Sequence, residues 1–387
     1  MDEVTRLLAE LVAIPSVNPM GRPVSGPEFL EGGMTDYLEG WFRRLGASFE
    51  RQNVSPGRDN VIARYEPSGA RRTVLFDAHQ DTVPTEGMTI DPFRPTVQDG
   101  RMFGRGACDI KGGMAAMLSA FARLVRERPE GSAAVVMACT VDEEFTHTGS
   151  SKLALTAHGA DLAVVAEPTE LQIVNCHKGA VRWKIRANGV ACHSSTPHLG
   201  ENAIYRMAAV VSVLSAHARE LSSGPSHPVL GPPTLSVGRI EGGQSVNVVP
   251  DRCEIEIDRR LVPGETPASC IARAEYFLRD RLGDLSDLEF LPPWVKMPPL
   301  SPEHSQSDRW VPPLRLAIAT ATGTAPTVTG VPYGTDAGPL GETGLPCLVF
   351  GPGNIAQAHT KDEWVDLDQV RQAAEAYYQI ALAVGSV

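Results

Sequence analysis

A histidine and an aspartate stand two positions apart at the end of an apolar run. Residues 74–79 are typical of a buried strand, and His79 is followed by Gln80 and Asp81. Because residues two apart in a strand point to the same side, His79 and Asp81 can touch. A carboxylate beside an imidazole fixes the tautomer of the ring and raises its basicity, as a metal-binding histidine requires. A structural hydrogen bond is the alternative interpretation of this pair.

Acidic residues mark two further segments. Asp109 lies among glycines at positions 104, 106, 112 and 113, which indicates a closely approached backbone that presents the carboxylate into a cavity. Capping of a helix is the alternative. Asp142, Glu143 and Glu144 follow the apolar run 135–141. Adjacent acids repel, and at a buried strand end they cost free energy unless a cation compensates them; a solvated turn is the alternative.

Two later segments repeat the pattern. Glu167 follows the apolar run 163–166, and His359 lies in a loop after the apolar run 347–350. Either residue alone would be an ordinary loop residue. Five segments now offer an oxygen or an imidazole ligand at a strand end, and open α/β sheets place their sites at the carboxyl ends of strands. The combination predicts one metal-dependent site.

The elements that position these residues alternate between helical and strand periodicity over residues 3–177. This alternation predicts an α/β fold, a layered catalytic domain with a central, largely parallel sheet flanked by helices. Helices are expected at 4–14, 29–45, 113–125 and 150–158, and buried strands at 61–65, 73–78, 133–140 and 162–166.

The order of elements changes between residues 178 and 293. There we expect strand 181–187, helix 202–221, strands 234–241 and 252–261, helix 267–282 and strand 288–291. Apolar and polar residues alternate in the strands, which favours an antiparallel sheet with one face in water. This βαββαβ order predicts an inserted ferredoxin-like domain at 178–293. Residues 294–387 resume the first pattern, so the catalytic domain comprises 1–177 and 294–387.

The composition is ordinary for a soluble globular protein, with 42% hydrophobic and 21% charged residues. A net charge of -11 argues against nucleic acid and anionic membranes as partners and favours a small-molecule substrate. The acidic start and the lack of a membrane-length apolar stretch predict a cytoplasmic protein. The seven cysteines are scattered without a Cys-x-x-Cys pair, so we expect reduced thiols rather than a thiolate zinc site.

The chain resembles the metallopeptidase and deacylase family that includes aminoacylase, acetylornithine deacetylase, succinyl-diaminopimelate desuccinylase and glutamate carboxypeptidase. The resemblance covers nearly the whole length. The motifs that carry it lie at 79–83, 106–112, 142–144, 167–169 and 358–360.

This resemblance implies two divalent metal ions per chain. Asp109 would bridge the ions, with His79 and Glu167 completing one site and Glu144 and His359 the other. Asp81 would orient His79. Imidazole and carboxylate ligands suit zinc best and also fit cobalt or manganese. The resemblance further implies that the inserted domain is a lid that pairs with its copy in a homodimer.

The expected reaction is hydrolysis of an amide bond. We expect water to attack the carbonyl after Glu143 takes its proton, and Glu143 then to protonate the leaving amine. The transition state also needs a donor for its oxyanion. His193, which follows the first strand of the insertion, is the expected donor because the family places this histidine over the partner subunit's site. His198 is a weaker candidate.

Arg260 is expected to bind the carboxylate of the substrate, since an arginine grips a carboxylate through two parallel bonds. An ion pair with Asp258, its neighbour on the same strand, is the alternative. We expect Asn247 to line the pocket. The family also uses the glycine-flanked loop that holds Thr335 and Asp336 near the substrate.

The expected substrate is an N-acyl amino acid, because residues 192–195 and 357–359 are most similar to acetylornithine deacetylase and succinyl-diaminopimelate desuccinylase. Cys192 stands where family members often carry glycine, which leaves the acyl group and the side chain open. A dipeptidase or carboxypeptidase would share the metal site and differ in the pocket. A non-catalytic binding protein on the same fold would be expected to lose a ligand or the base, and none is missing.

Overall fold

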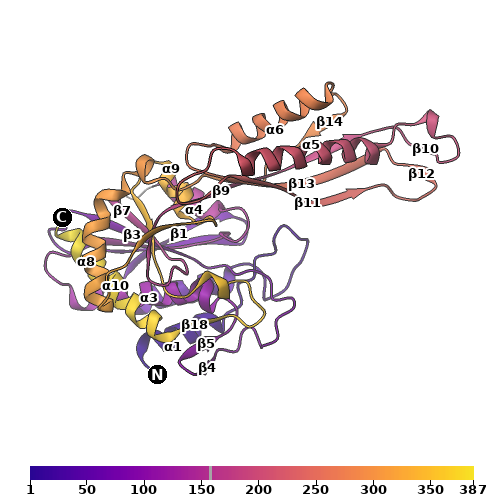
Figure 1. Cartoon of the computed structure of the whole chain (residues 1–387). Helices are drawn as coiled ribbons and strands as arrows, with labels where there is room; N and C mark the ends of the chain where they lie inside the picture. Colours follow the sequence, from indigo (N-terminus) through magenta and orange to yellow (C-terminus); the bar gives the residue numbers. More distant parts are fainter. Residues whose placement is uncertain (157–158) are drawn as a thin grey trace. The chain divides into compact units, whose positions relative to one another are not determined.

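Two compact units make up the chain in a computed structural model that describes residues 1–156 and 159–387 (Figure 1). The first unit comprises Met1–Cys176, Leu300–Gly330 and Thr335–Val387. The second comprises His177–Pro299 and Val331–Gly334. Both ends of the chain belong to the first unit, so the second unit interrupts it in the sequence.

An eight-stranded sheet with the strand order β1-β2-β6-β3-β7-β17-β8-β16 forms the centre of the first unit. β6, β3, β7 and β17 are parallel, whereas β1, β2 and β8 pair antiparallel. β3 and β6 are buried at every position after the first, as expected of strands covered on both faces. The α/β class is confirmed. The strands are β1 Ser48–Ser55, β2 Arg58–Tyr65, β3 Thr73–His79, β6 Ala134–Thr140, β7 Leu162–Val165, β8 Ile173–His177, β16 Val328–Val331 and β17 Cys347–Val349.

Helices cover this sheet and share one hydrophobic core with it. The ring of Tyr377 on α10 lies 5.4 Å from the rings of both Phe76 on β3 and Phe350 after β17, which fastens α10 to the sheet. The helices are α1 Glu3–Val12, α2 Gly32–Leu45, α3 Gly112–Glu127, α4 Thr148–Ala154, α7 Pro302–Ser305, α8 Val311–Thr322, α9 Ala337–Glu342 and α10 Leu367–Gly385. A small sheet adds β4 Thr96–Gln98, β5 Arg101–Phe103 and β18 Trp364–Asp366.

Some helix bounds differ from the expected ones. α2 begins at Gly32 rather than at residue 29 and ends at Leu45, where it is capped by Gly46, whose φ of 75° suits glycine. The helix expected at 150–158 is α4, and residues 157–158 lie outside the described residues. α10 begins after Asp366, whose side chain accepts hydrogen bonds from the backbone N–H groups of Asp368 and Gln369.

The second unit packs two helices against a five-stranded sheet (Figure 1). Its strand order is β11-β13-β9-β14, with β15 also paired to β9. Alternate residues of β13 are buried, which leaves one face of the sheet open. The unit continues past residue 293 because β15 pairs with β9. The elements are β9 Gly179–Asn188, β10 Cys192–His193, α5 Ala203–Ser223, β11 Thr234–Gly242, β12 Val248–Val249, β13 Arg252–Leu261, α6 Pro267–Leu282, β14 Leu288–Phe290 and β15 Val295–Met297.

Candidate active site

Parallel strands of the first unit carry the candidate ligands to one edge of its sheet. β3 ends at His79, which pairs with Thr140 at the end of β6. Glu144 follows β6, and Glu167 follows β7. Because these strands are parallel, their carboxyl ends meet at the same edge, and the side chains that follow them face a common space.

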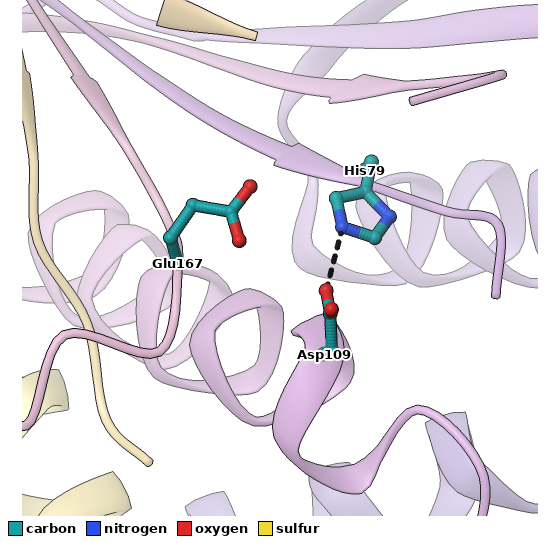
Figure 2. A group of neighbouring side chains, drawn as sticks. All are labelled: His79, Asp109 and Glu167. Carbon is teal, nitrogen blue, oxygen red and sulfur yellow. Dashed lines mark hydrogen bonds and ion pairs between the residues drawn. The ribbon is translucent and has the colours of Figure 1, made fainter. Parts of the chain in front are cut away.

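His79, Asp109 and Glu167 form a buried group whose ligand atoms lie within 4.8 Å of one another. Nε2 of His79 is 3.1 Å from Oδ1 of Asp109, and Figure 2 shows the carboxylate of Glu167 pointing toward them. Nδ1 of His79 lies 2.9 Å from the backbone carbonyl of Asp81. A carbonyl only accepts, so Nδ1 carries a proton and Nε2 is the nitrogen available to a metal ion.

Asp109, Glu144 and His359 form a second group with the same 4.8 Å limit. Nε2 of His359 lies 3.3 Å from Oδ2 of Asp109 and 3.1 Å from Oε2 of Glu144. The two oxygens of Asp109 therefore face different histidines, as a bridging carboxylate requires. Oε1 of Glu144 is buried and has no hydrogen-bond partner in the part of the chain that the structure describes.

The two ligand groups together contain more carboxylates than histidines. Burial and the nearby Asp109 raise the pKa of Glu144 to about 7, and raise the pKa of Glu167 well above its ordinary value. Hydrogen bonds to Asp109 and Glu144 raise the pKa of His359 to about 11. Buried carboxylates that repel one another and attract every nearby proton are suited to divalent cations. The donor set and the unpartnered oxygen of Glu144 thus fit two metal ions that share Asp109.

Asp81 contacts both His79 and the turn that carries Glu143 and Glu144. Its carboxylate accepts hydrogen bonds from the backbone N–H groups of Glu143 at 3.1 Å and Glu144 at 3.2 Å, and from the side chain of Asn18 at 2.8 Å. The carboxylate lies farther from His79, with Oδ1 at 3.7 Å from Nδ1. Asp81 therefore orients His79 through its carbonyl, and its carboxylate holds the turn that carries Glu143 and Glu144.

Glu143, the expected base, is 8% exposed and lies in a third buried group with His147 and Asp336. Burial and the charge of Glu167 raise its pKa well above the ordinary value. Thr335 and Asp336, expected near the substrate, are 0% and 1% exposed. Asp336 accepts hydrogen bonds from other side chains of the first unit, so the structure brings it to Glu143 rather than to an open surface.

The remaining candidates belong to the second unit. His193 is exposed at the end of β10, and its Nδ1 accepts the backbone N–H of Ser195 at 3.2 Å, which leaves Nε2 as the proton-bearing donor of the neutral ring. Asn247 is its neighbour, because the carbonyl of Asn247 accepts the backbone N–H of Ser194 at 3.0 Å. His193 thus ends β10 of the short two-stranded sheet, and Asn247 directly precedes β12, the other strand of that sheet.

Arg260 lies near the far end of β13, away from that short sheet along the strand. Its Nε donates to Oδ1 of Asp258 at 2.8 Å, and Oδ2 of the same carboxylate accepts from Arg182 at 2.7 Å. The ion pair expected as the alternative therefore exists. Two guanidinium groups share one carboxylate, so positive charge remains available at this position.

Glu363 is a functional candidate that the sequence did not indicate. Its carboxylate accepts the backbone N–H groups of Gly106 at 3.0 Å, Cys108 at 2.9 Å and Asp109 at 3.0 Å, and pairs with Arg105 at 2.7 Å. The side chain is 1% exposed. One carboxylate thus fixes the loop that presents Asp109. In the sequence, Glu363 is one of several charged residues after His359 and resembles a surface residue.

Replacing Glu363 with alanine is expected to lower the free energy of unfolding by about 3–5 kcal/mol, because Arg105 becomes a buried, unpaired charge. Glu86→Ala is the matched control, since Glu86 pairs with Arg22 at the same distance of 2.7 Å but on the surface. An exposed pair contributes about 0–1 kcal/mol. Urea denaturation of both variants measures the difference, and equal losses would show that Glu363 does not anchor the loop.

Comparison with known proteins assigns the family. The model of peptidase family M20/M25/M40 matches residues 75–383. The chain belongs to this M20 peptidase family. It is therefore a hydrolytic enzyme that acts on amide bonds.

Relatives of this M20 enzyme match it along nearly its whole length. The acetylornithine deacetylase of Pectobacterium carotovorum subsp. carotovorum is 32% identical over 391 residues, which cover 97% of this chain and 96% of the relative. A metallo-carboxypeptidase of the M20 family from Sulfolobus solfataricus has the same fold, with a TM-score of 0.78 at 20% identity over 100% of both chains. A dinuclear metal-binding M20 peptidase from Bacillus subtilis matches with a TM-score of 0.66 at 17% identity over 99% of this chain and 98% of that one.

Within residues 1–156 and 159–387, no helix combines the length and the apolar character needed to cross a membrane.

Proposed function

We propose that this M20 enzyme hydrolyses the amide bond of an N-acyl amino acid, with two divalent metal ions and with Glu143 as the general base. The observation that carries the proposal is the pair of ligand groups that share Asp109, one fully buried and one exposed at His359, next to a carboxylate that belongs to neither group. The substrate class is supported by the relative named acetylornithine deacetylase.

The metal ligands in this proposal are His79, Asp109 and Glu167 for one ion and Asp109, Glu144 and His359 for the other. Zinc is the proposed ion, because imidazole and carboxylate ligands suit it, while cobalt and manganese tolerate the same ligands. When bound, such ions lower the pKa of water and polarise a carbonyl group. Metal analysis of protein purified without chelator identifies the ion.

Glu143 moves the proton in this proposal. Its carboxylate takes a proton from the attacking water and delivers it to the nitrogen of the leaving amine. A single group thus serves both the attack of water and the departure of the amine. A raised pKa suits this double role, because the group must give up the proton that it has accepted. The Asp81 carboxylate supports it by holding the backbone of the Glu143 turn.

The second unit supplies the proposed substrate contacts. His193 would donate its Nε2 proton to the oxyanion of the transition state, which the exposed ring and the bond from Ser195 support. Arg260 would bind the carboxylate of the amino acid, with Asn247 also lining the pocket. The loop of Thr335 and Asp336 is also proposed to lie near the substrate; both residues are buried, and Asp336 belongs to the group that contains Glu143.

One screen tests the proposed function. Metal-loaded enzyme is incubated with N-acetyl, N-succinyl and N-formyl amino acids and with dipeptides, and the released amine is measured. Faster turnover of N-acyl amino acids supports the proposal. Preference for dipeptides would replace it with a peptidase function on the same site, and failure to cleave either class with two bound metal ions would overturn it.

A homodimer through the second unit is the proposed assembly. β11 is an edge strand of its sheet, and a hollow of about 820 Å³ is lined by Tyr205, Val246 and Val248, which are exposed although apolar. An open strand edge beside exposed apolar side chains is suited to a second copy of the same chain.

The Tyr205→Glu variant is expected to shift the enzyme from dimer to monomer, because a charge replaces an aromatic group that the partner would bury. Sedimentation velocity measures the mass against the chain mass of 41.5 kDa. Val229→Glu is the control, since Val229 is 57% exposed but does not line the hollow. A monomeric wild-type enzyme, or a dimer unaffected by Tyr205→Glu, would exclude this interface.

A further inference from the structure

His147 lies beside Glu143 and belongs to neither of the two ligand groups that share Asp109. Nδ1 of His147 lies 3.6 Å from Oε1 of Glu143 and 3.3 Å from Oδ1 of Asp336. All three residues are buried, with exposed fractions of 8% for Glu143, 8% for His147 and 1% for Asp336. One imidazole nitrogen therefore stands between two carboxylates, one of which is the proposed base.

The turn that joins Glu143 to His147 is held at several points. Asp142 accepts the backbone N–H of His147 at 2.7 Å on its carbonyl, and its carboxylate accepts the hydroxyls of Thr146 and Thr148. The same carboxylate pairs with Arg58 at 2.7 Å. These contacts fix the spacing of Glu143 and His147, which are four residues apart, without involving either side chain.

Asp336 is fixed by one residue before that turn and one residue after it. One of its carboxylate oxygens accepts the hydroxyl of Thr140 at 2.9 Å, and the other accepts the hydroxyl of Ser150 at 2.5 Å. Thr140 ends β6 and Ser150 lies in α4, so a strand and a helix both anchor the carboxylate. The oxygen bound by Ser150 is also the one that faces His147.

We propose that His147, held by Asp336, is the positioning residue for the Glu143 carboxylate. The inference rests on the proposed role of Glu143 as the general base. Asp336 binds the imidazole ring, and the ring limits the position of Oε1 of Glu143, from which its Nδ1 is 3.6 Å away. This separation is longer than a hydrogen bond, so the ring positions the Glu143 carboxylate by contact and leaves its oxygens available for proton transfer.

A third metal ion is the competing use of this group. A carboxylate accepts hydrogen bonds, so the contact between His147 and Asp336 places a proton on Nδ1. A nitrogen that carries a proton has no lone pair for a metal ion. The positioning role therefore predicts two metal ions per chain, and a third ion lost on replacing His147 would overturn it.

The test compares His147→Ala and His147→Asn in the metal-loaded enzyme. We expect His147→Ala to lower kcat by about 10- to 100-fold with KM and metal content unchanged, because a base displaced by about 1 Å loses up to about 100-fold in rate. The amide nitrogen of asparagine can replace Nδ1, and asparagine tolerates the φ of 56° at this position. His147→Asn should therefore recover most of the lost activity.

A double-mutant cycle with Glu143→Ala separates positioning from general structural damage. If His147 acts through Glu143, His147→Ala has no further effect on the residual rate of Glu143→Ala. Equal losses in both backgrounds, or wild-type kcat in His147→Ala, would overturn the proposal. His304→Asn, which changes an exposed histidine of α7, is the control for substitution itself.

The same cycle distinguishes this inference from the proposed function. If wild-type enzyme cleaves no amide substrate, or if Glu143→Ala is as active as wild type, the proposed function fails. If Glu143→Ala is inactive and His147→Ala is not impaired, the proposed function stands and only the positioning role is rejected.

Discussion

A Glu143→Ala variant is expected to lose about 10²- to 10⁴-fold in kcat, the range that general acid–base groups contribute. The loss arises because the neighbouring carboxylates are engaged elsewhere: Asp109, Glu144 and Glu167 belong to the two candidate ligand groups. Asp336 accepts the hydroxyls of Thr140 and Ser150. Metal content should remain at two ions per chain, since Glu143 is outside both groups. Steady-state kinetics and elemental analysis on the same preparation measure both quantities.

Two further variants make this result interpretable. Glu143→Gln keeps the size of the side chain but cannot accept the proton, so it should be as impaired as Glu143→Ala. Glu66→Ala removes an exposed carboxylate of the same unit and should leave kcat unchanged. Turnover near the wild-type value in Glu143→Gln with both ions bound would exclude Glu143 as the base.

An Asp109→Ala variant is expected to weaken the binding of both metal ions at once. Each oxygen of Asp109 faces a different histidine, so both groups lose a ligand together. The affinity should fall by more than the roughly 10- to 100-fold that the loss of an outer-shell partner costs. The loop itself should persist, because Glu363 binds its backbone rather than the side chain of Asp109. Isothermal titration with zinc measures the affinity and the number of sites.

Single-site variants provide the comparison for Asp109. Glu167→Ala should weaken the binding of one ion, and His359→Ala should weaken the binding of the other. In each variant the ion in the unchanged group should stay bound. Asp362→Ala removes an exposed carboxylate close to His359 in the sequence and should weaken neither. If Asp109→Ala retained one ion with wild-type affinity, the shared role of Asp109 would be wrong.

Strands could be predicted from the sequence where their burial requires a continuous run of apolar residues. β3 and β6 were located from such runs, and the ends of these strands pointed to His79 and to the acidic turn with Glu143. β1 was not expected, because most of its residues are polar and no apolar period marks it. It is an edge strand that pairs only with β2, so its place in the sheet depends on backbone hydrogen bonds.

Contacts between distant parts of the chain could not be predicted in the same way. Glu363 binds the N–H of Gly106 across 257 residues, and Asp336 binds Thr140 across 196 residues. Each is a single polar residue in a loop, which periodicity does not distinguish from a solvated residue. The pairing of His79 with Asp81 was expected through the carboxylate, yet the closer contact is the carbonyl, because backbone geometry decides which oxygen reaches the ring.

The position of Glu363 in the chain has a consequence for biosynthesis. Glu363 follows Asp109 by 254 residues, so the loop of Asp109 is synthesised long before this carboxylate can bind it. Proteins fold from the N-terminus as they are synthesised, and the strands that carry His79 and Glu144 emerge long before Glu363 does. The nascent chain therefore exposes several of the proposed metal ligands without the anchor that fixes the loop of Asp109, the proposed shared ligand. We therefore expect the loop of Asp109 to adopt its final conformation only after Glu363 has been synthesised.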